Sequence, residues 1–297
     1  MQKTYIIRFS EIMLKGKNRN YFEKKLKDNI VLSLKSNNVF DYKIKKLPGR
    51  IFILTNKNCD FLRYVFGIHS ISFSYKTDIS LDSIKKVVDK LLINLKFNTF
   101  RVTTKKADKK IKESSYFYSS KIGEHVFLNY NKKVDLKDYD LNITIEIFDN
   151  SAYIFTNSIS SIMGLPISTN GNILVIKDTI KYKNNFDELA AFFLMKRGCK
   201  IYFAINNEQE KNNFLFLKKF EQGKKFHYVN IKYIDNDFLT KYKITALSLG
   251  LTSKDYIDFI NNLNFSNKLL NNLIILSPLH SFNEKQIKEK TEELIKF

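Results

Sequence analysis

Hydrophobic positions along the chain change their spacing several times, and each change marks a predicted element. Residues 4–9 form a short apolar run, which predicts a strand, and a basic loop follows it. A helix is then predicted from apolar residues that recur at every fourth position and so share one face: Phe22, Leu26, Ile30 and Leu34. Residues 39–46 and 50–54 predict two more strands around a Pro48-Gly49 turn. The order strand, helix, strand, strand indicates a small α+β domain.

A second domain is predicted from the apolar segment 61–75 onward. Its first helix is indicated by apolar residues that share a face: Leu81, Ile84, Val88, Leu91 and Leu95. A strand at 100–104, a lysine-rich loop and a helix near 115–130 follow. Isoleucines then alternate with other residues from Ile143 to Ile147, as expected of a half-buried strand, and a turn leads into a last strand at 152–156.

Residues 157–172 carry no charge and are rich in Ser, Gly, Asn and Pro, so we expect a domain boundary there with few contacts across it. Beyond it, predicted strands alternate with helical segments, which is typical of a doubly wound parallel sheet: 173–176, 201–204, 226–231 and 273–276. The predicted organisation is a first domain at 1–57, a second at 58–160, a linker at 161–172 and a third domain at 173–297.

Charge suggests a polyanionic partner. The formal net charge is +20, and residues 1–170 hold 30 Lys or Arg against 16 Asp or Glu, or +14. Basic side chains gain affinity for nucleic acid because they release counterions condensed on the phosphates. An AT-rich genome would also raise the lysine content, since only six of the 50 basic residues are Arg. The distribution of charge makes the N-terminal half the better candidate for RNA binding.

Other site chemistries are not indicated by the sequence. Cys59 and Cys199 lie far apart and form no CxxC spacing, so neither a disulfide framework nor a metal site is expected, and Cys199 is interpreted as a core residue. The four histidines are dispersed and show no catalytic spacing. No apolar stretch approaches the roughly 20 residues that span a bilayer, so we expect no membrane association and a cytoplasmic location.

Several short motifs resemble the tRNA 4-thiouridine synthetase (ThiI) family. Its opening is matched by Arg8, Glu11, the run Leu14-Lys15-Gly16-Lys17-Asn18-Arg19 and Phe22-Glu23. Its THUMP domain, an RNA-binding module, is matched by Arg101-Val102, Ile122-Gly123, Val126, Lys133-Val134-Asp135-Leu136, Asp140 and Glu146. Its linker and its ATP-pyrophosphatase domain are matched by Gly164-Leu165-Pro166, Gly171, Ala190-Ala191 and Leu194-Met195-Lys196-Arg197-Gly198.

The resemblance implies an N-terminal ferredoxin-like domain, a THUMP domain and a C-terminal Rossmann-like domain of the PP-loop ATPase type. It also implies tRNA as the partner. The family uses ATP and Mg to adenylate a tRNA uridine, which then receives sulfur carried on a cysteine, and some members are linked to thiamine thiazole synthesis. These properties are expectations that come from the resemblance, not from the spacing of residues.

The adenylating motif departs from the family pattern. The family carries a glycine-rich loop whose backbone N–H groups approach ATP phosphates at a helix start, but the stretch 177–188 (KDTIKYKNNFDE) contains no glycine. A degenerate nucleotide site is left at the matching positions: Lys183, Asn184, Asn185 and Asp187. The sulfur-transfer cysteine is also missing. We therefore expect no catalytic residue and no cofactor for this chain alone.

RNA-binding candidates fall into two basic segments. One follows the first strand: Lys15, Lys17 and Arg19. The other belongs to the THUMP-like region: Arg101, Lys105, Lys106, Lys109, Lys110 and Lys121. Solvated basic loops are the alternative interpretation of both segments. Two functions remain open: tRNA thiolation with a sulfur-carrier protein or a catalytic paralogue as partner, or a non-catalytic tRNA-binding adaptor or chaperone unrelated to thiolation. A homodimer is compatible with either function.

Overall fold

The computed structural model describes residues 2–107, 111–176, 186–223, 225–253, 255, 257 and 273–297. The chain divides into two compact units. Unit 1 comprises Met1–Arg8, Val39–Asp60 and Ser70–Ser160, and unit 2 comprises Phe9–Asn38, Phe61–His69 and Ser161–Phe297. Within the described part of the chain, no helix is both long and apolar enough to cross a membrane.

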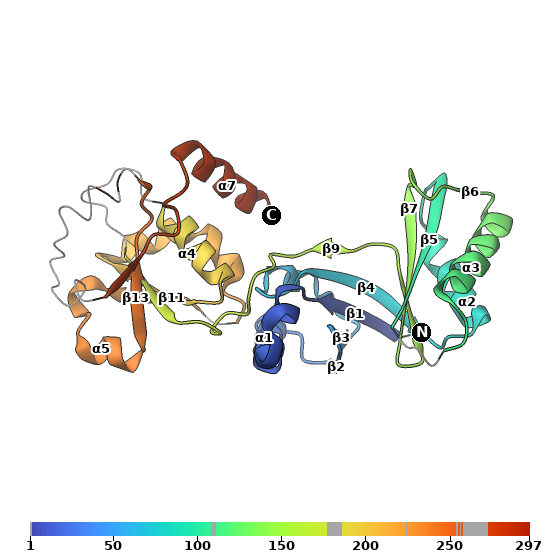
Figure 1. Cartoon of the computed structure of the whole chain (residues 1–297), viewed down its shortest axis with the longest axis horizontal. Coiled ribbons are helices and arrows are strands. Elements are labelled where there is room, and N and C mark those ends of the chain that lie inside the picture. The colour runs from blue at the N-terminus through green and yellow to red at the C-terminus, as the bar shows by residue number, and fades with distance from the viewer. Residues whose placement is uncertain are drawn as a thin grey trace. The chain divides into compact units, whose positions relative to one another are not determined.

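Unit 1 is built on one mixed sheet (Figure 1). Its described strands are β1 (Gln2–Arg8), β2 (Lys43–Leu47), β3 (Arg50–Leu54), β4 (Ser70–Thr77), β5 (Thr99–Lys106), β6 (Lys133–Val134), β7 (Leu141–Phe148), β8 (Ser151–Phe155) and β9 (Ile159–Ser160). They lie in the order β2-β3-β1-β4-β8-β7-β5-β6, and β9 pairs with β4. Strand β4 is antiparallel both to β1 on one side and to β8 on the other, so it joins the two predicted N-terminal domains into one sheet.

Two helices cover one face of this sheet beside β5 and β7, as Figure 1 shows. They are α2 (Leu81–Leu92) and α3 (Ser115–Tyr130), and each is preceded by a capping serine, Ser80 or Ser114, whose side chain accepts a backbone N–H of the first turn. Their apolar faces bury Val88 and Ile122 against Ile143, Ile145 and Ile147 of β7. The alternation predicted for 143–147 therefore corresponds to a strand that buries its isoleucines under two helices.

Unit 2 contains a parallel sheet in the order β12-β11-β10-β13-β14. Its strands are β10 (Asn172–Ile176), β11 (Lys200–Ile205), β12 (His227–Asn230), β13 (Ile244–Ser248) and β14 (Ile274–Leu276). The described helices are α1 (Arg19–Ser36), α4 (Asp187–Lys196), α5 (Asn236–Lys241) and α7 (Glu284–Lys296), with 3₁₀ turns η1 (Glu11–Asn18), η2 (Asp60–Tyr64), η3 (Glu208–Phe214), η4 (Phe216–Phe220) and η5 (Ile231–Tyr233). Chain order reverses between β10 and β13, which makes this the switch point of a doubly wound sheet. The predicted combination of α+β and doubly wound α/β architecture is confirmed.

Segments from the first 70 residues belong to the compact core of unit 2. Phe66 is 2 % exposed, and its ring centroid lies 5.7 Å from that of Phe192 and 5.5 Å from that of Phe220. Asn29 of α1 donates to the carbonyl of Ile167 at 3.2 Å. The expectation that few contacts cross the uncharged segment 157–172 was therefore wrong, because polarity of a segment does not report what packs on either side of it. The three predicted boundaries, at 57/58, 160/161 and 172/173, stay predictions.

Candidate functional site

The first basic segment lies in η1 and at the start of α1. The ammonium of Lys15 sits over the ring of Phe22, 5.0 Å from its centroid, and Lys17 is exposed. Arg19 donates to the buried carboxylate of Glu23 at 2.7 Å, one helical turn later. Arg19 therefore has an internal acceptor that offsets its charge, whereas Lys17 extends into solvent.

The second basic segment follows β5 and the loop after it. Arg101 stacks on Tyr139, with its guanidinium carbon 4.0 Å from the ring centroid, and donates to the carbonyl of Leu136 at 3.4 Å. Lys105 is exposed. Arg101 and Lys105 are four residues apart on one strand, so their side chains leave the same face of the sheet. These two cations are the members of the segment that the structure brings together.

The remaining candidates of this segment are engaged elsewhere or lie outside the described residues. The ammonium of Lys106 donates to the carbonyl of Ile111 at 2.7 Å and to that of Glu113 at 2.8 Å, so it closes the loop that follows β5. Lys121 pairs with Glu124 at 2.9 Å on the exposed surface of α3. Lys109 and Lys110 lie outside the described residues.

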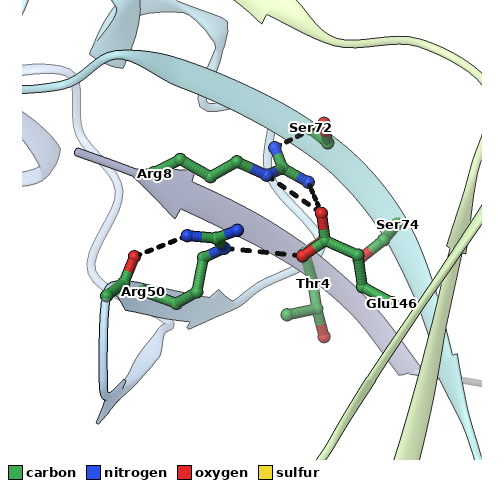
Figure 2. Close-up of polar contacts among 7 residues, drawn as sticks. Thr4, Arg8, Arg50, Ser72, Ser74 and Glu146 are labelled. Carbon is green, nitrogen blue, oxygen red and sulfur yellow. Dashed lines mark hydrogen bonds and ion pairs between the residues drawn. The ribbon is translucent and has the colours of Figure 1, made fainter. Parts of the chain in front are cut away.

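A buried cluster of charges in unit 1 was not predicted as a cluster, although Arg8 and Glu146 both belong to the motifs described above. Figure 2 shows Arg8 of β1 and Arg50 of β3 pointing at Glu146 of β7. Glu146 is 1 % exposed and accepts from Arg8 Nε at 3.1 Å, from Arg8 Nη2 at 2.8 Å and from Arg50 Nε at 3.5 Å. Arg8 also donates to the hydroxyl of Ser72 in β4 at 2.9 Å. Burial lowers the pKa of the Arg8 guanidinium, and the Glu146 carboxylate opposes that shift.

This cluster closes a bend in the sheet. In sheet order β4 and β8 separate β1 from β7, so the Arg8 and Glu146 side chains can meet only if the sheet curls. Aromatic contacts follow the same bend, because Phe52 of β3 lies 4.6 Å from Tyr153 of β8 and 5.7 Å from Phe148 of β7, between ring centroids. The strand pair β2–β3 is thus packed against the strand pair β7–β8. Sequence spacing gave no signal of this, since 138 residues separate Arg8 from Glu146.

Of the four positions expected to form a degenerate nucleotide site, Asp187 is described, and it lies at the switch point of the unit 2 sheet, where the chain follows β10 and meets the residues after β13. Asp187 is the first residue of α4 and is 3 % exposed, and its carboxylate accepts the backbone N–H of Gly250 at 2.7 Å. The N–H of Phe186 donates to the carbonyl of Gly250 at 3.2 Å. Lys183, Asn184 and Asn185 lie outside the described residues.

Glycine is required at position 250 by the closeness of this contact. A Cβ added to Gly250 would lie 2.2 Å from the backbone nitrogen of Asp187, a distance that no side chain tolerates. The backbone after β13 therefore rests directly on the start of α4. A helix start is normally the place where an anion binds, because unsatisfied N–H groups and the positive end of the helix dipole meet there. Here the backbone of Gly250 lies against the helix start, and the Asp187 carboxylate accepts the N–H of Gly250.

Comparisons with known proteins identify the two N-terminal segments. Residues 4–72 match the family model of the ThiI ferredoxin-like domain, and residues 79–157 match that of the THUMP domain. The chain belongs to the ThiI family. The first match takes in β1 to β3 with α1, and the second takes in α2, α3 and the strands around Arg101 and Glu146, so the predicted resemblance is confirmed.

Curated relatives of this ThiI-family chain carry the description "probable tRNA sulfurtransferase". The protein of Mycoplasmopsis synoviae is 35 % identical over 204 residues, which are 68 % of this chain and 51 % of the relative. The protein of Thermococcus kodakarensis is 32 % identical over 239 residues, which are 77 % of this chain and 61 % of the relative. The chain thus spans between half and three fifths of the length of these relatives.

Two solved structures resemble the chain along almost its whole length. PH1313 from Pyrococcus horikoshii has a TM-score of 0.83 and 30 % identity, and the match covers 98 % of this chain and 99 % of that one. A 4-thiouridine synthetase in complex with RNA and bound ATP has a TM-score of 0.78 and 23 % identity, with 99 % and 85 % covered. At that level of identity the second structure supports the ThiI fold alone.

Proposed function

We propose that this chain binds tRNA through its ferredoxin-like and THUMP segments and serves tRNA thiolation without adenylating the RNA itself. Three observations support the first half: the THUMP match at 79–157, the exposed cations along η1 and β5, and the tRNA sulfurtransferase description of relatives. Phosphate contacts by Lys17, Arg101 and Lys105 would supply affinity that depends on salt.

The proposal that the chain does not adenylate RNA rests on a single observation, the contact between Asp187 and Gly250. ATP binding by the family's loop needs free backbone N–H groups at the helix start, and a triphosphate there would meet the buried Asp187 carboxylate. Two anions cannot share that position unless a cation bridges them. Because the backbone of Gly250 also lies against the helix start, we propose that the described residues leave no place there for the phosphates of ATP and that the chain uses no cofactor of its own.

Under this proposal another protein supplies the missing chemistry. A sulfur-carrier protein or a catalytic paralogue would bring the adenylating loop and the reactive cysteine, while this chain holds the tRNA. Both described cysteines are buried, which agrees with a chain that does not carry sulfur itself. We propose on the same grounds that the chain does not itself carry out thiamine thiazole chemistry, because the described residues offer no reactive group for it.

The experiment combines binding with a cellular measurement. Purified chain is expected to bind tRNA, with log affinity falling steeply against log salt, and to show no shift of Tm with ATP and Mg at millimolar concentration. Cells that lack the protein are expected to lose 4-thiouridine from tRNA. Release of AMP when the chain alone is given ATP and tRNA would overturn the proposal that it does not adenylate RNA. Unchanged 4-thiouridine in the deletion strain would instead favour an adaptor unrelated to thiolation.

A further inference from the structure

Basic residues gather at the amino-terminal edge of the parallel sheet in unit 2. The strands are parallel, so their first residues share one edge. Strand β11 begins at Lys200 and β12 begins at His227, two residues after Lys225. Strand β13 follows directly on Lys243, and α5 ends at Lys241 just before it. We call these five residues the basic rim.

Two cations of the rim, Lys200 and Lys241, contact aromatic rings. The ammonium of Lys200 donates to the hydroxyl of Tyr202 at 2.6 Å and lies 4.6 Å from the centroid of that ring. Lys241 lies 5.4 Å from the ring of Tyr242, whose centroid is 4.8 Å from that of His227. These partners are neutral, so they fix the side chains without cancelling their charge.

Among the described residues, carboxylates do not pair with the lysines of the rim. In the described part of the chain, none of its four lysines forms an ion pair. The nearby Glu221 accepts the backbone N–H of Phe226 at 2.9 Å. Burial lowers the pKa of His227, and the nearby charges of Lys200 and Lys241 act in the same direction.

The opposite edge of the same sheet, where the strands end, is mainly acidic in its described residues. The described residues that follow its strands include the acidic side chains of Asp187, Glu188, Glu208, Glu210, Asp235 and Asp255 and the basic side chains of Lys211 and Lys232. Doubly wound sheets ordinarily bind ligands at this carboxyl edge. In this chain the described charges instead favour an anion at the amino edge.

We propose that the basic rim binds the phosphate backbone of structured RNA, so that unit 2 makes an RNA contact of its own. The proposal rests on the proposed function for the identity of the partner, and on charge complementarity for the surface. Strands lie about 4.8 Å apart, so the rim spans roughly 15 Å from β12 to β13. That width faces several phosphates of one strand, and exposed lysines meet phosphates without sequence preference.

The test compares two triple variants of the full chain in tRNA binding. The rim variant is Lys225→Gln, Lys241→Gln and Lys243→Asn, with Asn chosen because the backbone of residue 243 is left-handed (φ +49°). The control variant replaces three exposed lysines of α7 in the same unit by Gln: Lys285, Lys288 and Lys296. Both remove three positive charges, so the net charge stays equal. Lys200 is left in place because it holds Tyr202.

The rim variant is expected to bind tRNA about tenfold or more weakly, and the slope of log affinity against log salt should shrink by about three, one for each lost contact. The control should keep both values near those of the wild type. In a second measurement that needs no variant, bound tRNA should protect Lys241 and Lys243 from acetylation, read by mass spectrometry.

Equal behaviour of the two variants, or acetylation of Lys241 and Lys243 at an unchanged rate with tRNA bound, would overturn the rim proposal. Either result would leave tRNA binding by the chain intact. A wild-type chain that fails to bind tRNA would overturn the proposed function, and with it the rim. The two failures are therefore distinguished by the wild-type measurement alone.

Discussion

Arg8 in β1 donates two hydrogen bonds, of 3.1 and 2.8 Å, to Glu146 in β7, although two strands lie between β1 and β7 in the sheet. The carboxylate is almost wholly buried and also accepts a hydrogen bond from Arg50. One negative charge therefore pairs with two positive charges. The cluster fixes the angle between the ferredoxin-like strands and the THUMP strands. It therefore fixes where Arg101 and Lys105 are presented.

Replacing Glu146 should be costly. Glu146→Ala leaves the mostly buried guanidinium of Arg8 and the partly exposed guanidinium of Arg50 without their shared carboxylate, which is expected to lower the free energy of unfolding by about 3 kcal/mol, measured by urea titration. Glu146→Gln keeps an acceptor oxygen and should cost less. Lys45→Ala is the control, because Lys45 pairs with Asp149 in an exposed position, and its loss should change stability by less than about 1 kcal/mol. Similar losses in Glu146→Ala and Lys45→Ala would contradict the role given to the cluster.

Lys105 and Lys106 should respond differently to the same substitution. Lys105→Gln removes an exposed cation, so tRNA affinity should weaken and the salt slope should fall by about one. Lys106→Gln takes away the ammonium that bonds the carbonyls of Ile111 and Glu113, so Tm should drop while the salt slope stays constant. Isothermal titration at several salt concentrations and thermal melts separate the two effects. A reduced slope in Lys106→Gln would mean that this lysine also contacts RNA.

Both cysteine thiols should be inert in the native protein. Burial raises the pKa of Cys59 to about 12, and burial also raises the pKa of Cys199 while Arg197 opposes it. At pH 8 both thiols therefore form less thiolate than an ordinary cysteine, so a disulfide reagent should react slowly with the folded protein. Because the folded pKa of Cys59 is raised, its contribution to stability is complete below the ordinary thiol value and is lost as pH rises toward 12. Fast labelling of Cys199 at pH 8 would contradict this prediction and make Cys199 a candidate sulfur carrier.

Phe66 should matter for the stability of unit 2 although it lies 106 residues before the first strand of that unit's sheet, which begins at Asn172. Phe66→Ala should lower the free energy of unfolding by about 3–5 kcal/mol, because the ring packs between Phe192 and Phe220. Phe40→Ala, at a site 69 % exposed, serves as the control with little effect. A fragment of residues 1–170 exposes Phe66 and should bind a hydrophobic dye. Cooperative melting of that fragment at the wild-type Tm would contradict this view of the core.

The order of elements could be predicted from the sequence because it depends on local patterns. Alternation at 143–147, the helical spacing from Phe22 to Leu34 and the Pro48-Gly49 turn each act over a few residues. What joins distant elements could not be predicted. Nothing in the neighbourhood of Phe66 shows that it packs on Phe192. The contact between Asp187 and Gly250 was missed for the same reason, since it depends on how two loops meet at the end of a parallel sheet.

Strand β4 hydrogen bonds to β1 on one side and to β8 on the other, and this has a consequence for synthesis. When β4 leaves the ribosome, β1 and β3 are already available, but β8 is roughly 80 residues away, or about 4–16 s of translation. Throughout that interval the free edge of β4 offers unpaired backbone groups to any extended chain nearby. The nascent protein therefore passes through a stage in which a chaperone that covers the edge of β4 would prevent wrong pairing. The rate of translation between β4 and β8, and so the choice of codons there, sets how long that stage lasts.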